Sequence, residues 1–434
     1  MYLNDLQKYL EEHEVVGVDS INKDVEKELM LYIKILLFLY ADDTILLSES
    51  SEDLQFMLNI FANYCNQWKL KINIDKTKIL IFSKGRVSNN EKFYLEGKEV
   101  EIVKNYKYLG VIFAKSGSFL TMRKYIKEQA IKAMYNLLQN CRRNNLSIEC
   151  QLDMFDKAIV PILLYGSEIW GFENLDLIEK VHLRFCKIIL NLKQSTPNSI
   201  IYGELGRYPL SISVKLRMVK FWCRIVNSDE NKFSAILYKL LYINSNNYGF
   251  ENKWMTFMKT IFDHCGLSNV WRSQNYFPQE WIETSIELRL KDQFKQEWSS
   301  DIFNSSKTIC YRIFKNDFLF EQYISILPPY LMNFICKLRC GSHRLPIETG
   351  RWKNIQRSER LCNLCNLNEI GDEYHFIMNC YFFKKERKCL LPQYCQSNTN
   401  VLKFKQLLSS KDIVVLEKLA KFVKIVFKKV VPPG

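Results

Sequence analysis

Leu36-Leu37-Phe38-Leu39-Tyr40-Ala41-Asp42-Asp43-Thr44-Ile45-Leu46-Leu47 is an apolar run that is broken once, by two adjacent carboxylates. Short runs rich in Ile, Leu, Phe and Tyr on both sides of a turn-sized polar interruption predict the two strands of a hairpin. This pattern places Asp42 and Asp43 at the tip of the hairpin. Aspartate is also a common turn residue, so the local sequence alone favours a purely structural turn. The rest of the chain has to decide between the two interpretations.

The composition describes an ordinary globular protein with an unusual charge. The chain has 434 residues, enough for two or three domains, with 47% hydrophobic and 25% charged residues. Its net charge of +14 suggests a polyanionic partner such as nucleic acid. The charge is uneven: residues 1–50 carry four lysines and eleven acids, a net of −7, whereas residues 351–434 carry sixteen basic and seven acidic residues, a net of +9.

Cysteine usage and hydropathy indicate the cellular compartment of the protein. The fourteen cysteines show no regular framework spacing, which indicates a reducing compartment. No apolar run approaches the roughly 20 residues of a membrane span, and the first residues lack the plan of a secretory signal. We expect a nuclear or cytoplasmic protein that is neither secreted nor held in a membrane.

The periodicity of the chain predicts an α+β fold. We expect helices over 2–14 and 54–68, the second capped near Ser50, a strand over 79–82, a small hairpin over 93–103, and one strand with an internal glycine over 106–113. From residue 119 the period becomes 3.6 and predicts helices over 121–140, 148–159, 176–190, 213–226 and 232–241. The segment 243–247, rich in Asn and Ser, is expected to be a domain boundary, and a basic helix closes the chain.

Several segments resemble a known family in the order in which the family carries them. Tyr40-Ala41-Asp42-Asp43 between two apolar strands resembles the catalytic hairpin of reverse transcriptases, and residues 68–78 resemble the palm segment that follows it. Residues 106–110 resemble the strand that grips the primer end, with Tyr108, Leu109 and Gly110 as the grip. Residues 163–170 and 204–210 resemble the region that follows in proteins of non-LTR, LINE-type retrotransposons. Four ordered signatures favour a catalytic role for the two aspartates over a structural turn.

The resemblance implies an RNA-directed DNA polymerase that acts on an RNA template and a DNA primer or target. Nucleotidyl transfer uses two divalent ions, Mg²⁺ or Mn²⁺, and such hard ions prefer oxygen ligands. Asp42 and Asp43 are the expected metal ligands. Lys76, or alternatively Lys78, is the expected proton donor to the pyrophosphate, although each also fits a solvated turn lysine.

One departure from the family bears on activity. The resemblance implies a third carboxylate on an earlier strand, after fingers that close on the template, and Asp5, Asp19 and Asp24 do not lie in a matching context. We therefore expect the C-terminal part of a larger polymerase, inactive alone, with the missing N-terminal part as a partner. The expected division is a partial palm over 1–116, a thumb-like region over 117–242, a helical linker over 243–350, a zinc module over 351–400 and a basic helix over 401–434.

A Cys and His cluster lies near the end of the chain. Cys362, Cys365, His375 and Cys380 offer three thiolates and one imidazole, the ligand set of a closed structural Zn²⁺ site, against chance placement of scattered cysteines. The cluster resembles the C-terminal module of LINE-type proteins. Basic residues near it, interleaved with aromatic ones, suit phosphate contact and base stacking. The expected nucleic-acid contacts are Arg339, Arg344, Arg351, Arg357, Arg360, Lys384 and Lys385.

Three functions remain open from the sequence. The first is an RNA-directed DNA polymerase acting through Asp42 and Asp43. The second is a catalytically dead remnant that binds RNA or DNA through the thumb and the zinc module. The third, a helical scaffold with one zinc site, leaves the ordered palm motifs unexplained.

Overall fold

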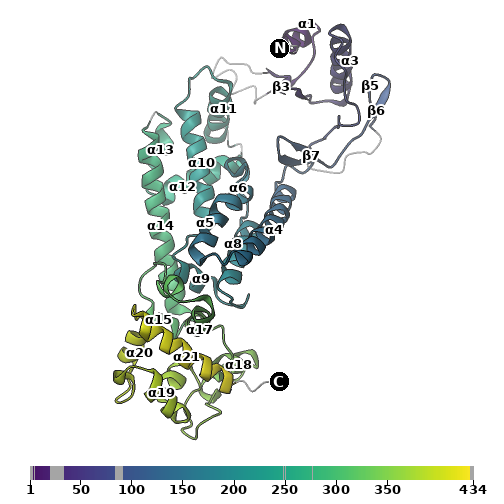
Figure 1. Ribbon diagram of the computed structural model, residues 1–434. Helices are drawn as coiled ribbons and strands as arrows, with labels where there is room; N and C mark the ends of the chain where they lie inside the picture. The colour runs from purple at the N-terminus through teal and green to yellow at the C-terminus, as the bar shows by residue number, and fades with distance from the viewer. Residues whose placement is uncertain are drawn as a thin grey trace. The chain divides into compact units, whose positions relative to one another are not determined.

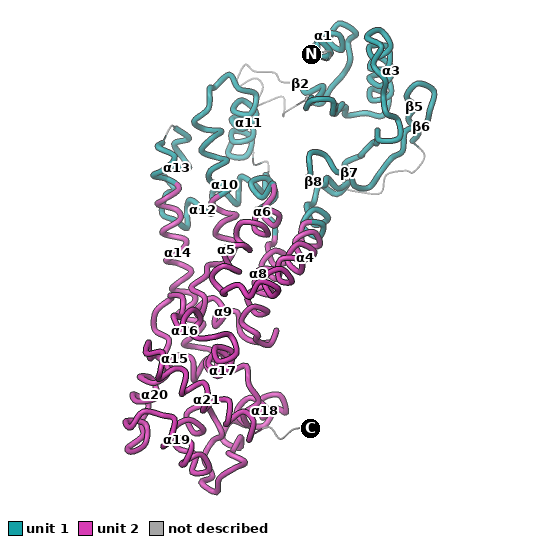
Figure 2. The backbone as a smooth tube through the Cα atoms, in the orientation of Figure 1, with its two compact units in different colours: residues 1–125, 166–173, 217–282 teal, residues 126–165, 174–216, 283–434 magenta. Residues whose placement is uncertain are grey.

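The computed structural model describes residues 3, 5–19, 34–83, 91–247, 249, 251–275 and 277–430 (Figure 1). These residues form two units, coloured in Figure 2. Unit 1 comprises residues 1–125, 166–173 and 217–282, and unit 2 comprises residues 126–165, 174–216 and 283–434. The division falls inside three helices, α4 (Leu120–Arg143), α10 (Leu210–Val226) and α14 (Gln279–Asn304).

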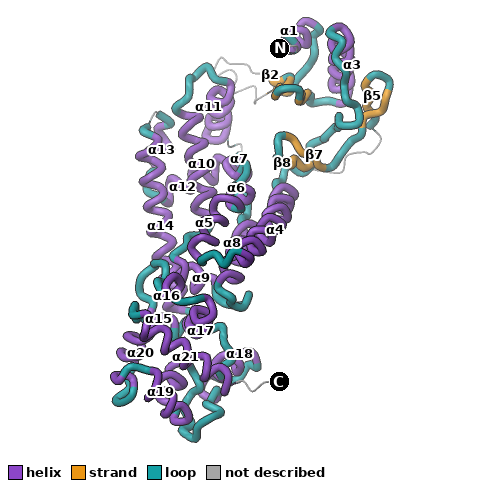
Figure 3. Tube along the Cα trace, in the orientation of Figure 1, coloured by secondary structure: helices purple, strands orange, loops and turns teal. Residues whose placement is uncertain are grey.

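The named strands of the described residues all lie in unit 1, where they form four separate antiparallel pairs (Figure 3). The pairs are β1 (Val18–Asp19) with β2 (Lys34–Ile35), β3 (Leu37–Tyr40) with β4 (Asp43–Leu46), β5 (Phe93–Leu95) with β6 (Lys98–Val100), and β7 (Asn105–Tyr108) with β8 (Val111–Ala114). They accompany the helices α1 (Leu6–Glu12) and α3 (Ser51–Gln67). The predicted α+β class is confirmed.

Helix α3 organises this part of unit 1. Its N-terminus is capped as expected, because the backbone N–H of Asp53 donates to the Ser50 hydroxyl at 3.1 Å. One face of α3 packs with α1 in a core that includes Leu6, Leu10 and Tyr64. Another face packs on the β5–β6 hairpin in a second core. The helix thereby connects two small cores, neither of which is large enough to be stable alone.

The hairpins turn at residues in the left-handed region of backbone conformation. The β5–β6 turn has Glu96 at φ 50° and Gly97 at φ 75°, which is the geometry that suits the twist of two-residue hairpin loops. The β7–β8 turn has Leu109 at φ 45° and Gly110 at φ 81°. The predicted single strand over 106–113 is therefore wrong, because the chain reverses at Leu109-Gly110 and the two halves pair. The predicted strand over 79–82 is reduced to one bridge between Ile79 and Ile102.

The remainder of unit 1 is helical. It contains α7 (Ser167–Trp170), α11 (Phe233–Asn247), α12 (Lys253–His264) and α13 (Ser268–Ser273). The segment 243–247, expected to interrupt the chain, is the last part of α11. Asn and Ser have only moderately poor helix propensity, so the preceding apolar helix continues through them.

Unit 2 is built from helices, and the predicted helices over 148–159 and 176–190 are confirmed. Its helices are α5 (Ile148–Ala158), α6 (Val160–Leu163), α8 (Asp176–Ile189), α9 (Asn198–Leu205), α15 (Tyr311–Phe314), α16 (Tyr323–Ile326), α17 (Pro329–Arg339), α18 (Pro346–Trp352), α19 (Lys384–Leu390), α20 (Val401–Leu408) and α21 (Ile413–Val430). Short 3₁₀ turns cover Arg357–Glu359, Tyr381–Phe383 and Gln393–Cys395, and a π-helix covers His375–Asn379. No helix of the described residues has the length and apolar character needed to cross a bilayer.

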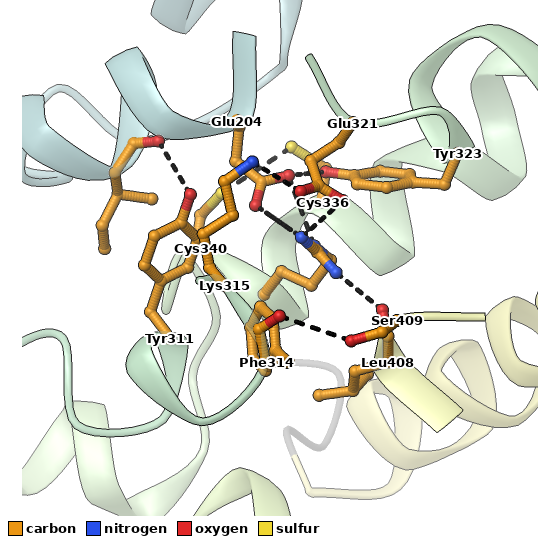
Figure 4. A network of polar contacts seen from close by, with 12 residues as sticks. Glu204, Tyr311, Phe314, Lys315, Glu321, Tyr323, Cys336, Cys340, Leu408 and Ser409 are labelled. Atoms are coloured by element: carbon orange, nitrogen blue, oxygen red, sulfur yellow. Dashed lines mark hydrogen bonds and ion pairs between the residues drawn. The ribbon is translucent and has the colours of Figure 1, made fainter. Parts of the chain in front are cut away.

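A buried ionic network lies in the interior of unit 2 (Figure 4). The guanidinium of Arg339 contacts the carboxylates of Glu204 and Glu321, and it donates to the backbone oxygen of Leu408 at 2.6 Å. The Tyr323 hydroxyl donates to Glu204 at 2.7 Å. Four separate segments of the chain therefore meet at one arginine side chain.

Candidate functional site

The hairpin predicted around Asp42 and Asp43 is present. Strands β3 and β4 pair from Leu37↔Leu46 to Tyr40↔Asp43, which leaves Ala41 and Asp42 as a two-residue turn. The base of the hairpin is fixed by a backbone hydrogen bond of 2.9 Å from Leu47 to Leu36 and by the burial of Leu36 in the α1–α3 core. The tip is exposed. A rigid base thus presents two carboxylates to solvent.

The two carboxylates are open to ligands. Asp42 and Asp43 are exposed, and no basic side chain within the described ranges forms an ion pair with either of them. Two adjacent carboxylates are the hard oxygen donors that Mg²⁺ or Mn²⁺ prefers, and they fill only part of the coordination of two ions. The residues therefore fit a metal site that is completed by phosphate, water and a further carboxylate.

The other acids considered for the metal site do not join the hairpin. Asp5 accepts a hydrogen bond of 2.5 Å from the Tyr64 hydroxyl, which ties it to the contact between α1 and α3. Asp24 lies outside the described residues, and for Asp19 the structure describes only its place in β1. Asp5 is thus occupied by a packing contact.

The β7–β8 hairpin carries the three residues of the expected primer grip. Tyr108 ends β7, and Leu109 and Gly110 form the turn. Burial raises the pKa of the Tyr108 hydroxyl, and the negative charge of Asp43 raises it further. The Tyr108 hydroxyl therefore responds to the charge that Asp43 carries on the β3–β4 hairpin.

The structure distinguishes Lys76 from Lys78. The ammonium of Lys78 forms an ion pair of 2.9 Å with Glu101. The side chain of Lys76 is exposed, and its ammonium has no acidic partner within the described part of the chain. The Lys76 backbone is held by a turn, in which its N–H donates to the Asn73 side chain at 3.2 Å. Lys76 is thus the more available of the two ammonium groups.

The four Cys and His residues of the second candidate site come together. The donor atoms of Cys362, Cys365, His375 and Cys380 all lie within 4.8 Å of one another. The Cys362 and Cys380 sulfurs are 3.9 Å apart, and the Cys365 sulfur is 3.4 Å from His375 Nε2. Ligands about 2.3 Å and 2.0 Å from a tetrahedral Zn²⁺ would have separations of this size. The residues present therefore fit a closed zinc site.

Local backbone structure explains this convergence. An antiparallel bridge between Leu361 and Ile370 closes the loop that carries the first two ligands, and Cys362 N–H donates to Glu369 O at 2.8 Å. Gly371 is required there, because a Cβ atom at this residue would lie 2.8 Å from Pro346. His375 begins the π-helix that leads to Cys380.

A second group of residues supports the four ligands. Glu369 lies 2.6 Å from His375 Nδ1, which leaves Nε2 directed at the cluster. Arg387 is buried and donates to the backbone oxygen of Cys380 at 2.9 Å. The hydrogen bond between the two sulfurs lowers the pKa of the Cys362 thiol and raises the pKa of the Cys380 thiol, so Cys362 is the first of the two to become a thiolate, the form that binds metal.

Glu369 and Arg387 were missed at the level of sequence. Arg387 lies in the basic run Lys384–Lys388 and is indistinguishable there from its exposed neighbours. Glu369 occurs in a short polar loop without periodicity. The spacing of six residues between Glu369 and His375 is a weak signal for a carboxylate that orients a histidine.

The basic residues expected to bind nucleic acid fall into three groups. Arg344, Lys384 and Lys385 are exposed. Arg351 contacts Glu348, Arg357 contacts Asp372 at 3.4 Å, and Arg360 donates to the backbone oxygens of Ile347 and Ile355. The prediction for Arg339 is wrong, because its side chain is only 1% exposed and its donors are used inside unit 2.

Comparison with known proteins identifies the class of the hairpin segment. Residues 16–113 match the sequence family described as reverse transcriptase (RNA-dependent DNA polymerase). This segment includes β3, β4, helix α3 and the β7–β8 hairpin up to residue 113. The two exposed aspartates and the tyrosine near them thus lie in a part of the chain that is homologous to reverse transcriptases.

The alignments with individual relatives are longer than this segment. The chain is 26% identical over 165 residues to the RNA-directed DNA polymerase from mobile element jockey of Drosophila melanogaster, covering 36% of this chain and 18% of the relative. It is 25% identical over 165 residues to the jockey polymerase of Drosophila funebris, again covering 36% and 18%. A transposon-derived protein of Caenorhabditis elegans is 27% identical over 182 residues, covering 41% of this chain and 63% of the relative.

These matches confirm the resemblance to polymerases of non-LTR, LINE-type retrotransposons. The matched part of the chain corresponds to about a fifth of the length of the jockey proteins.

Proposed function

We propose that this chain contributes the catalytic hairpin and the primer-holding hairpin of an RNA-directed DNA polymerase of the non-LTR retrotransposon type. The observation that carries the proposal is the pair of exposed carboxylates of Asp42 and Asp43, which form no ion pair with any described residue and lie at the turn of an anchored hairpin, within a segment homologous to reverse transcriptases. The substrates are a deoxynucleoside triphosphate, a DNA primer end and an RNA template.

Asp42 and Asp43 would hold divalent ions, Mg²⁺ or Mn²⁺. When bound, such ions lower the pKa of the primer 3′ hydroxyl and neutralise charge on the leaving pyrophosphate. The hairpin fixes the position of both carboxylates through its anchored base, so the ligands need no rearrangement during the reaction. Tyr108, Leu109 and Gly110 would hold the primer end beside them, and Lys76 would donate a proton to the leaving pyrophosphate.

Primer extension on an RNA template tests the polymerase. We expect a Mg²⁺- or Mn²⁺-dependent product when a second polypeptide supplies the further carboxylate, and Asp42→Asn should lower its yield by about 10³-fold, because a metal ligand stabilises several kcal/mol of transition-state charge. Asp301→Asn, which changes an exposed aspartate of unit 2, is the matched control and leaves the yield unchanged. If the supplemented chain extends no primer at any concentration of either ion, the catalytic proposal is rejected.

A second candidate function is nucleic-acid binding without catalysis. It is favoured by the exposed cations Arg344, Lys384 and Lys385 near the Cys and His cluster and by the net charge of +14. Arg351, Arg357 and Arg360 belong to the same proposed surface. Each of them would contact phosphate while it keeps its hydrogen bonds to the neighbouring carboxylate or backbone oxygens. In this case the chain binds RNA or DNA with an affinity that falls steeply with salt and forms no extension product.

The Cys and His cluster is proposed as a structural Zn²⁺ site of the same protein. The ligand set and the separations within 4.8 Å support this assignment. With no open coordination position among four protein ligands, its role would be to fold the segment around α18 and α19 and not to catalyse a reaction.

A further inference from the structure

Unit 2 contains a cavity of about 400 Å³ that lies outside both candidate sites. It is bounded by the segment after α8, by the loop between α17 and α18, and by the last part of α21. The lining residues that matter below are Lys193, Lys337, His343, Arg344, Leu345 and Phe427. The volume lies in the range of small-molecule sites and exceeds what a bare phosphate fills.

Three cations line the cavity. Lys193, Lys337 and Arg344 come from two segments about 150 residues apart in sequence. Burial lowers the pKa of Lys193; Glu348 opposes this effect, and the charges of Arg344 and Lys337 lower the pKa further. The three cations are therefore close enough to repel one another. A nearby anion would relieve that repulsion.

The cations are not neutralised within the cavity. Neither Lys337 nor Arg344 forms an ion pair with any acid among the described residues, and Glu348 is bonded to Arg351 at 2.5 Å. Lys193 is held in place by neutral groups, since its ammonium donates to the backbone oxygen of His343 at 2.8 Å and lies 4.0 Å from the centre of the Trp352 ring. The cavity therefore has a fixed cation and two unpaired ones.

Part of the cavity lining is apolar. Leu345 and Val430 are buried, and Phe427 is partly exposed. The Phe427 ring is held 5.6 Å from the His343 ring, and His343 is itself fixed by Glu373 at 2.9 Å. An aromatic face beside a cationic wall is the combination that binds a base together with its phosphate.

We propose that this cavity binds one unpaired nucleotide of a nucleic-acid strand, with its phosphate against Lys193, Lys337 and Arg344 and its base against Phe427 and Leu345. The proposal deepens the proposed function, because it takes nucleic acid as the partner. It assigns the contact to a defined cavity in unit 2, whereas the hairpin of Asp42 and Asp43 belongs to unit 1. The bound strand would be anchored at this point independently of its position at the polymerase residues.

Binding of a short fluorescein-labelled single-stranded RNA to the whole chain, measured by fluorescence anisotropy without divalent ions, tests the proposal. We expect Lys337→Ala and Arg344→Ala each to weaken binding about tenfold and to reduce the slope of log affinity against log salt by about one. Lys418→Ala removes an exposed cation on α21 that does not line the cavity and serves as the matched control. Unchanged folding of each variant is verified by circular dichroism.

Competitors identify the chemistry of the ligand. Adenosine monophosphate should displace the RNA from the cavity at lower concentration than inorganic phosphate, because only the nucleotide reaches Phe427. Equal competition by the two would contradict the base contact, and equal affinity of the cavity variants and Lys418→Ala would overturn the site. A single-stranded DNA of the same sequence shows whether the sugar matters.

Primer extension by the same preparations separates the two proposals. If extension fails while the cavity variants still lose RNA affinity, the polymerase is rejected and the cavity stands. If extension succeeds while the cavity variants bind like the control, the cavity is rejected and the polymerase stands. A chain that binds neither RNA nor DNA overturns the cavity assignment outright.

Discussion

The guanidinium of Arg339 lies 3.0 Å from Oε1 of Glu204, a residue 135 positions earlier in the chain, and both side chains are buried. The same guanidinium contacts Glu321 at 2.8 Å. The carboxylates raise the pKa of Arg339 despite its burial, which by itself lowers it. A cluster of this kind is stable as a whole but sensitive to the loss of any member.

Removing the arginine should therefore strongly destabilise unit 2. Arg339→Met keeps most of the volume but leaves Glu204 as an uncompensated buried charge, which costs about 3–5 kcal/mol. Urea unfolding followed by circular dichroism measures the loss. Arg344→Ala, at an exposed arginine five residues away, should change the free energy of unfolding by less than about 0.5 kcal/mol. Similar losses for both variants would contradict the structural role of Arg339.

Loss of the metal should unfold the Cys and His segment. We expect one zinc per chain by elemental analysis, and none in Cys365→Ser. At free zinc about a thousandfold above its dissociation constant, chelation should lower the apparent stability by about 4 kcal/mol. Cys389→Ser changes an exposed cysteine outside the cluster and should retain the metal. A zinc-free wild-type chain of unchanged stability would exclude the site.

Substitution of Lys76 and of Lys78, the two lysines that follow the hairpin of Asp42 and Asp43, should have different effects on rate and stability. Lys76→Ala should lower the rate of primer extension by about 10²-fold or more, the usual contribution of a positioned proton donor. Lys78→Ala breaks the ion pair with Glu101 and should cost about 1 kcal/mol of stability at most, with little effect on the rate. Rapid-quench measurement of single nucleotide addition separates the two. The opposite ranking would assign the proton transfer to Lys78.

The α1–α3 core should lose stability at alkaline pH through Cys65. Burial raises the pKa of the Cys65 thiol from 9.0 to about 11, whereas the unfolded chain releases this proton near 9.0. Between these values the folded state binds more protons, so the free energy of unfolding falls as pH rises from 9 to 11, and this group has no effect below 9. Urea unfolding across this range should show a shallower fall for Cys65→Val than for the wild type. Parallel curves would contradict the prediction.

The features that were predictable from sequence are those whose pattern lies within one short segment of the chain. The hairpin of Asp42 and Asp43 shows as a sharp contrast between apolar and acidic residues, and the Cys and His cluster shows as a spacing of four ligands. The cap at Ser50 follows from the residues around it alone. Each of these signals is local, so no knowledge of the rest of the chain is needed to interpret it.

The predictions that failed depend on distant partners or on unusual backbone conformations. Arg339 resembles the exposed arginines nearby, and only the position of Glu204 in the fold makes it a buried residue. The reversal at Leu109-Gly110 was missed because leucine rarely adopts a positive φ. The cavity of Lys193, Lys337 and Phe427 joins three segments, and nothing in any one of them indicates the other two.

The bond from Arg339 to the backbone oxygen of Leu408 affects how the protein can be divided. A fragment ending near residue 400 would keep the Cys and His cluster but lose α20, and with it the acceptor for one nitrogen of a buried cation. A fragment starting near residue 351 would lose the whole of α17, Arg339 included, and expose the face of α21 that packs on α17. The segment 351–400 is therefore not a transferable module, and domain exchange between related chains should use boundaries that keep α17, α20 and α21 together.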